Sequence, residues 1–215
     1  MQLYKSVYRA GEFRETINKS IFIAHVSPVR DDREAREFIA GIKEEYKDAT
    51  HNVPAFVTGN KQEHQWASDD GEPQGTSGPP VLNLLTENEL TNLALVVTRY
   101  FGGTLLGTGG LVRAYSGAVK EGLKNSVIVE KRLAEKLTVQ TDYTGLGKIQ
   151  YILGEENITV LDSEYTDQVV LTLLVPVDAV EPLMAKLTEG TNGRCVIERA
   201  EKLYYGLLGK EIVFF

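Results

Sequence analysis

The C-terminal part of the chain carries the pattern that most limits its possible folds. After residue 135, segments with the apolar character of strands are interrupted twice by segments with apolar residues at helical spacing. The expected order is strand, helix, strand, strand, helix, strand. The four strands are expected at 136–143, 159–166, 168–177 and 196–205. The first helix is expected at 146–156, and Asp178 caps the second. This order is the split βαβ or ferredoxin-like arrangement. We therefore predict a separate C-terminal domain.

The N-terminal part predicts a second mixture of strands and helices. The expected strands cover residues 5–9, 12–18, 20–26, 49–58, 65–68 and 93–98. Asp31 or Asp32 begins one expected helix, Pro79-Pro80 opens a second, and a third ends near Lys124. The charged run at 130–135 separates the two patterns, so we expect domains at 1–132 and 133–215, both of the α+β class.

Two glycine-rich clusters, at residues 66–80 and 99–115, flank the apolar strand expected at 93–98. Glycine is entropically costly, so chains collect it where the backbone takes a positive φ or closely approaches another group. Loops of this kind often carry function on a rigid scaffold. The two clusters therefore indicate a functional surface.

The second cluster suggests a site for an anion. Its glycines at 107–110 come directly before an expected helix, whose amides would carry partial positive charge, and Arg113 follows within about a turn. Aromatic residues at the strand end could stack on bases or simply pack. The expected anion- or nucleic-acid-binding face consists of Arg99, Tyr100, Gly102, Gly103, Gly107, Thr108, Gly109, Gly110 and Arg113, with Lys120 as a possible addition. The alternative is that these glycines only permit an unusual loop and close packing.

The first cluster contains three carboxylates, Asp69, Asp70 and Glu72, which could order a turn, bind a cation or act in acid–base chemistry. Turn formation is favoured, because aspartates often bond their own backbone and the spacing is not that of a calcium loop. His51 could hydrogen-bond across to this acidic turn.

Other chemistry finds little support in the sequence. The histidines are isolated, Cys195 is the single cysteine, and no nucleophile–base set or nucleotide-binding signature is present. We therefore expect no catalytic residue, metal or cofactor.

Composition limits the partners. The formal net charge is −7 and neither half is basic, so any nucleic-acid contact must use a local patch. The single cysteine, together with the absence of a signal peptide or a long apolar segment, predicts a cytoplasmic protein with no membrane contact. Binding to DNA is not expected.

Three stretches carry a resemblance to a known family: residues 69–73 (DDGEP), 96–103 (VVTRYFGG) and 105–115 (LLGTGGLVRAY). They resemble the signature of the YigZ/IMPACT family, in its bacterial branch. Many bacterial members place a cysteine soon after the histidine that His51 matches, whereas this chain has Val53. The resemblance implies a first domain like a ribosomal small-subunit protein domain and elongation factor G domain IV, and a second domain like elongation factor G domain V.

The same resemblance implies a link to translation, because eukaryotic members restrain a kinase of translational control. The expected function is a translation-associated regulator that binds the ribosome, structured RNA or a translation partner through the glycine-rich face. Two alternatives remain. One is an enzyme acting on a phosphorylated or carboxylated small molecule, although no catalytic set is recognised. The other is a regulator that only binds proteins, which would suit the acidic composition.

Overall fold

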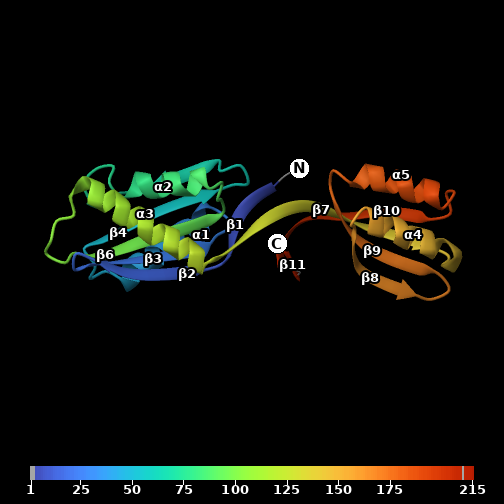
Figure 1. Cartoon of the computed structure of the whole chain (residues 1–215), viewed down its shortest axis with the longest axis horizontal. Coiled ribbons are helices and arrows are strands. Elements are labelled where there is room, and N and C mark those ends of the chain that lie inside the picture. Colours follow the sequence, from blue (N-terminus) through green and yellow to red (C-terminus); the bar gives the residue numbers. More distant parts are fainter. Residues whose placement is uncertain (1–2, 210) are drawn as a thin grey trace. The chain divides into compact units, whose positions relative to one another are not determined.

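A computed structural model of the chain describes residues 3–209 and 211–215. The chain divides into two compact units (Figure 1). Tyr4–Glu130 forms the first unit, and Lys131–Phe215 makes up nearly all of the second. Each unit combines helices with an antiparallel sheet, so the predicted α+β class is confirmed.

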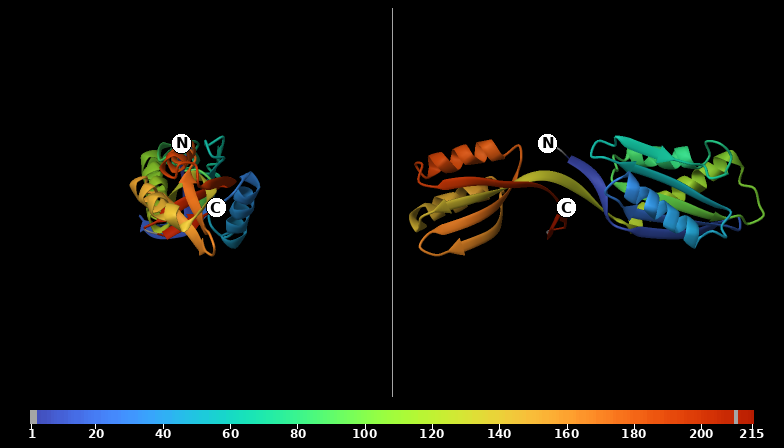
Figure 2. Two further views of the ribbon diagram at one scale, coloured as in Figure 1. Left: turned by 90° about the vertical axis from the view of Figure 1, so that its right-hand side faces the viewer. Right: turned by 180° about the vertical axis from the view of Figure 1, so that it is seen from behind.

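The first unit is built on a five-stranded antiparallel sheet with the order β2-β3-β6-β4-β5. Three helices cover it, α2 and α3 on one face and α1 on the other, as the front and rear views show (Figures 1 and 2). The elements of this unit are β1 (Leu3–Arg9), β2 (Gly11–Ile17), β3 (Ser20–Pro28), α1 (Asp32–Glu45), β4 (His51–Thr58), β5 (His64–Ala67), α2 (Gly78–Glu87), β6 (Leu93–Tyr100) and α3 (Gly107–Asn125).

Strand β6 is central because both of its faces are buried. Leu95 and Val97 belong to the core beneath α2 and α3, whereas Ala94 and Val96 belong to the smaller core beneath α1. Successive strand residues point to opposite faces of a sheet, so a strand covered on both sides needs a continuous apolar run. This explains why the continuous apolar run at 93–98 predicts a strand so clearly.

The helix starts follow local chemistry in different ways. Asp31 caps α1, accepting a hydrogen bond from the amide of Glu34 at 2.9 Å. Helix α3 begins at Gly107, so the glycines at 107–110 form its first turn, whereas we expected them to precede it. No helix within residues 3–209 and 211–215 combines the length and the apolar character needed to cross a membrane.

The second unit has the sheet order β10-β7-β9-β8, with every neighbouring pair antiparallel. This is the strand order of a ferredoxin-like βαββαβ domain, so that prediction is confirmed. The helices pack on the sheet through a common apolar core. The elements are β7 (Val127–Thr141), α4 (Tyr143–Glu155), β8 (Thr159–Tyr165), β9 (Val169–Pro176), α5 (Val180–Gly190), β10 (Val196–Leu208) and β11 (Glu211–Phe214).

Three details of this unit differ from the expectation. Ala179, and not Asp178, occupies the cap position of α5 and makes no side-chain cap bond. The chain also adds strand β11, which pairs with the end of β10 and lies beyond the last strand we expected. Finally, the charged run at 130–135 is no separate connector, because it lies inside β7, while the chain divides between Glu130 and Lys131.

The charge of Glu135 fits inside a strand because a partner meets it across the sheet. Its side chain is buried and accepts hydrogen bonds from Arg199 Nε at 2.6 Å and Nη2 at 2.9 Å. Arg199 also donates to Glu181 at 2.7 Å. The hydrogen bonds from Arg199 lower the pKa of Glu135, so the carboxylate stays charged. A charged sequence run therefore extends the strand here.

The two units should unfold separately, and Glu135→Gln tests this. The substitution keeps the side-chain shape but removes the charge that Arg199 pairs with, so the second unit should lose stability. We expect circular dichroism to show a lower urea midpoint for the unfolding of the second unit. Fluorescence of Trp66, the one tryptophan of the chain and part of the first unit, should keep its midpoint.

The control for this experiment is Glu201→Gln, which removes an exposed partner of Lys136 and should change neither midpoint appreciably. If Glu135→Gln moves the Trp66 transition as far as the circular dichroism transition, the units unfold as one body and the prediction is wrong.

Candidate functional site

The site begins where the start of β4 lies beside the end of β6 in the sheet of the first unit. His51 on β4 and Arg99 on β6 are direct cross-strand partners. By strand alternation both side chains point to the same face as Val53 and Val97, toward α2 and α3. The sheet therefore places an imidazole beside a guanidinium under the helical layer.

The acidic turn after β5 is held together by Asp69. Its carboxylate accepts hydrogen bonds from the amides of Gly75 at 2.7 Å, Ser77 at 3.0 Å and Gly78 at 2.8 Å, and from the Ser77 hydroxyl at 2.8 Å. Burial by itself would raise the pKa of Asp69, but these hydrogen bonds together lower it. One carboxylate thus folds the loop back to the start of α2.

Asp70 attaches this turn to its surroundings. Its carboxylate accepts from Lys43 Nζ of α1 at 2.5 Å and from the amide of Asn52 at 2.6 Å. Asp70 and Gly71 both take positive φ, at 48° and 86°, which sharply redirects the chain. The Asp70 carbonyl lies 2.8 Å from His51 Nδ1. Since a carbonyl only accepts, Nδ1 carries the proton and Nε2 is left to face other partners.

Glu72 enters the core as a result of this turn. Its Oε1 accepts from Arg99 Nη1 and from the Tyr115 hydroxyl of α3, both at 2.6 Å. The side chains of Glu72 and Arg99 are only 3% and 5% exposed, so the ion pair is shielded from water. His51 Nε2 lies 3.8 Å from Glu72 Oε2. Burial first, and the hydrogen bond to Glu72 second, raise the pKa of Tyr115, which stays a neutral donor.

Aromatic rings enclose the guanidinium. Arg99 lies over the rings of Phe22 and Phe101, at 5.3 and 5.5 Å from their centroids. Arg99 Nη2 also donates to the Ser20 hydroxyl at 3.4 Å, while its Nε is buried with no hydrogen-bond partner among the described residues. Arg99 is therefore an internal charge.

A pocket of about 400 Å³ opens above this buried set. Its polar part comes from His51, Glu72 and Arg99, and its wall is largely apolar. The remaining lining residues are Thr50, Gly71, Pro73, Phe101, Leu105, Leu106, Gly107, Thr108 and Leu111. Such a mixture suits a ligand with an apolar or planar body and one polar group.

The rim of the pocket is the start of α3. Gly107 has a φ of +68°, and no side chain caps the helix. Gly107, Thr108 and Gly109 are exposed, so the free amides of the first turn face outward. Arg113 is exposed too, and its Nη1 lies 3.7 Å from where a Cβ on Gly109 would stand. The rim thus combines backbone donors with a guanidinium.

The structure separates residues that we expected on one exposed face. Arg99 is buried and bound to Glu72, so it offers no free guanidinium fork at the surface. Tyr100, next along β6, points to the opposite face and donates to Asp48 at 2.8 Å. Strand alternation is the reason, because adjacent side chains cannot share a face. Lys120 lies outside the pocket, in another groove with Lys124.

The glycine pair after β6 has a structural role that the geometry makes plain. A Cβ on Gly102 would come within 2.1 Å of the Lys19 backbone, so only glycine fits there. Gly103 takes a φ of +80°. The pair turns the chain away from the sheet and toward the pocket rim.

Several residues of the site escaped the sequence analysis. Tyr115 was part of the family signature but was not selected for the site, and Leu105 was not selected either. A signal existed for Leu105, which is a large apolar residue inside a glycine-rich segment, and the structure leaves it 86% exposed. Among the described residues, no group of three or more His, Cys, Asp or Glu side chains gathers in a way that could hold a metal ion.

Comparison with known proteins places both parts of the chain. Residues 18–123 match the family described as Impact N-terminal domain, and residues 139–194 match a domain of unknown function (DUF1949). The first match contains every residue that lines the pocket.

Several relatives are similar to the chain. "IMPACT family member YvyE" of Bacillus subtilis (strain 168) is 42% identical over 201 residues, which cover 94% of this chain and 93% of that protein. "IMPACT family member YigZ" of Escherichia coli (strain K12) is 36% identical over 181 residues, with coverages of 83% and 89%. "Protein IMPACT" of Mus musculus is 30% identical over 140 residues, 63% of this chain and 42% of that protein.

A solved structure, described as "Crystal structure of an hypothetical protein", is also similar. It shares 33% sequence identity, covers 94% of this chain and 98% of its own, and superposes with a TM-score of 0.59.

Asp69→Asn should destabilise the first unit. The amide that replaces the carboxylate cannot accept all of the turn's hydrogen bonds, and we expect a loss of about 1–3 kcal/mol in the free energy of unfolding. Because the folded-state pKa of Asp69 is lowered, this stabilisation is present above its ordinary pKa and disappears as the pH falls through the folded value. Urea titrations followed by Trp66 fluorescence should therefore converge for the two proteins in acid.

The control is Asp48→Asn, which affects only an exposed bond to Tyr100 and should cost less than about 0.5 kcal/mol. A wild-type stability for Asp69→Asn at neutral pH would show that the turn does not depend on this carboxylate.

Removing either partner of the buried ion pair should cost more stability when the other partner is present than when it is already gone. Glu72→Gln or Arg99→Met alone leaves a buried charge unpaired, with an expected loss of about 3–5 kcal/mol. The double variant should lose clearly less than the sum of the two single losses. Chemical denaturation of the four proteins completes the cycle, and strictly additive losses would contradict a direct coupling.

Proposed function

Because the chain belongs to the IMPACT family, we propose that it is a translation-associated regulatory protein that binds structured RNA, such as that of the ribosome. The link to translation rests on the likeness to the eukaryotic members of the family. In this proposal the contact is made at the rim of the pocket, which Gly107, Thr108, Gly109 and Arg113 form.

The observation that carries the proposal is the uncapped, exposed start of α3 beside the Arg113 guanidinium. Outward-facing amides at a helix N-terminus and a planar, permanent cation both suit a phosphate group. Phe101 adds an aromatic surface, 43% exposed, at the same pocket. A base can stack on such a ring while its phosphate lies at the helix start.

The acidic composition supports a local contact over a broad one. With a formal net charge of −7, most of the surface repels a polyanion, so few phosphates can be neutralised at once. Binding should therefore depend on salt with a shallow slope, since the slope scales with the number of phosphates contacted. Membership of a ribosome-bound assembly would supply further contacts.

A second function, binding or turnover of a small molecule, is favoured by one specific observation. His51 Nε2 and Glu72 Oε2 lie 3.8 Å apart, and both residues line a pocket of about 400 Å³. A pocket of that size accepts a small ligand, and a carboxylate next to an imidazole can bind a donor group or assist proton transfer. A copurifying ligand that His51→Ala abolishes would favour this function over RNA binding.

Arg113→Ala should weaken binding to ribosomes by about 1–3 kcal/mol, the value of a charge-assisted hydrogen bond, while leaving the folded state intact. Co-sedimentation with purified ribosomes over a protein titration measures the change. Circular dichroism and Trp66 fluorescence verify the fold.

The matched control is Arg33→Ala. Arg33 is an exposed arginine of α1, a helix on the opposite face of the sheet, and it pairs with the exposed Glu37. The Arg33→Ala variant should co-sediment with ribosomes like the wild type. If Arg113→Ala and Arg33→Ala behave alike, or if the wild-type chain does not sediment with ribosomes, the proposed contact is wrong.

A further inference from the structure

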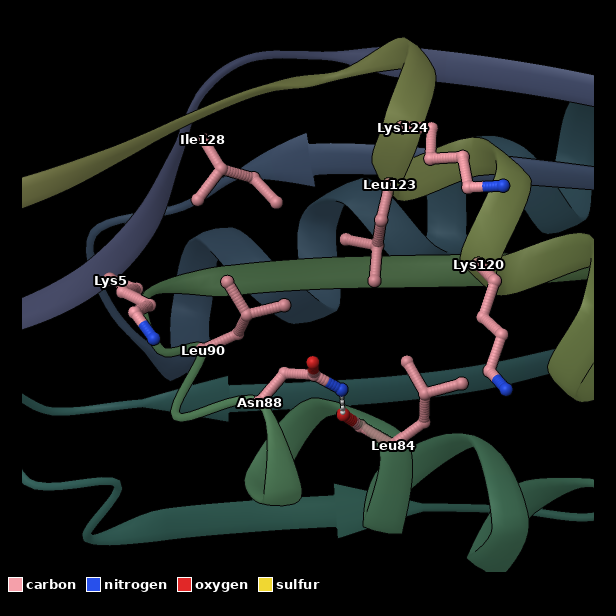
Figure 3. Close-up of a pocket in the computed structure, with 8 residues that line it drawn as sticks. All are labelled: Lys5, Leu84, Asn88, Leu90, Lys120, Leu123, Lys124 and Ile128. Carbon is pink, nitrogen blue, oxygen red and sulfur yellow. Dashed lines mark hydrogen bonds between the residues drawn. The ribbon is translucent and has the colours of Figure 1, made fainter.

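The first unit contains a second groove, near the C-terminal ends of α2 and α3 (Figure 3). Its volume is about 380 Å³, and it shares no lining residue with the pocket above Glu72. Residues from α2, α3 and the strand β1 contribute to it, together with Ile128, which lies in the part of β7 that belongs to the first unit. The groove is therefore a separate feature of the same unit.

The floor of the groove is aliphatic. Leu84, Leu90 and Leu123 are nearly buried in the core of the unit and present their remaining surface to the groove. Ile128 is 40% exposed at its edge. Exposed aliphatic surface in a concave setting gains free energy when an apolar side chain covers it.

Three lysines stand around this apolar floor. Figure 3 shows Lys5 at one end and Lys120 and Lys124 toward the other, with the leucines between them. The cations therefore flank the apolar surface on two sides. In a chain with a net charge of −7, such a local group of cations is distinctive.

The lysines are available to an incoming anion. Lys120 has no hydrogen-bond or ion-pair partner among the residues that the structure describes. Lys5 pairs with Glu89 at 3.4 Å, and Lys124 pairs with Glu121 at 2.5 Å, but these side chains are exposed. Exposed ion pairs contribute little to stability, so an incoming carboxylate can replace them at small cost.

We propose that this groove binds a peptide segment of a partner protein in which apolar side chains are flanked on both sides by acidic residues. The aliphatic floor takes the apolar side chains, and the lysines at the two ends pair with the flanking carboxylates. A fatty acid fits less well, because its single carboxylate matches one end and its apolar tail would meet a lysine at the other. Nucleic acid would leave the aliphatic floor uncovered.

The test uses a short fluorescein-labelled peptide whose central leucines are flanked by glutamates, titrated with the full chain and followed by fluorescence anisotropy. Two matched peptides carry lysines in place of the glutamates, or serines in place of the leucines. Laurate serves as a competitor that represents single-headed amphiphiles. We expect saturable binding of the acidic apolar peptide only, with no competition by laurate.

Lys120→Glu should weaken binding of this peptide about tenfold or more, since it replaces an attractive charge with a repulsive one. The matched control is Lys61→Glu, the same charge change at an exposed lysine of the same unit outside the groove. Ile128→Ser, at an exposed position, should weaken binding through lost apolar contact. All variants should keep the wild-type Trp66 unfolding midpoint.

Equal binding of the acidic and lysine-flanked peptides, or equal loss in Lys120→Glu and Lys61→Glu, would overturn the proposal. Displacement by laurate, with no preference for flanking glutamates, would do so as well. Because Arg113 lies outside this groove, Arg113→Ala should bind the peptide normally, which keeps this result independent of the RNA-binding proposal.

Discussion

The buried ion pair between Glu72 and Arg99 is the interaction on which the first unit's functional end depends. Two charges removed from water are costly unless each is well paired, and here Oε1 of the carboxylate receives two short hydrogen bonds, from Arg99 and Tyr115. These three residues come from a loop, a central strand and a helix. One carboxylate thus connects three segments at the end of the central strand.

The pocket follows from that connection. Glu72 reaches the core only because Asp69 folds the preceding turn and Asp70 attaches it to α1 and β4. Once the turn is held, its backbone forms one side of the pocket, and the glycine-rich start of α3 forms the other. The three acidic residues that look equivalent in the sequence therefore do three different things, namely ordering a loop, anchoring it and neutralising Arg99.

An acidic protein has few places for an anionic partner, and this unit offers two candidates. Arg113 stands at the start of α3, where amides face outward, and Lys120 stands two turns further along, above an aliphatic floor. The chemistry differs accordingly. The first place suits a compact, strongly charged group such as phosphate, whereas the second suits carboxylates attached to apolar side chains. The proposed RNA contact and the proposed peptide contact would therefore use separate surfaces of the unit.

The sequence by itself determined the α+β class and the ferredoxin-like order of the second unit. Alternation and helical spacing are local signals. Strand β6 could be predicted from its continuous apolar run, which it has because both of its faces are buried. The sequence also singled out the glycine turn, Arg113 and the hydrogen bond from His51 to the acidic turn, but it did not pair Glu72 with Arg99. Glu72 and Arg99 are 27 residues apart, and only the packed sheet decides that they meet and that Tyr100 points away. Likewise, the charged run at 130–135 can lie within a strand because Arg199, on the neighbouring strand, pairs with Glu135. Tertiary structure decides such pairings because a charge is stable in the interior only where a distant segment brings its counterpart.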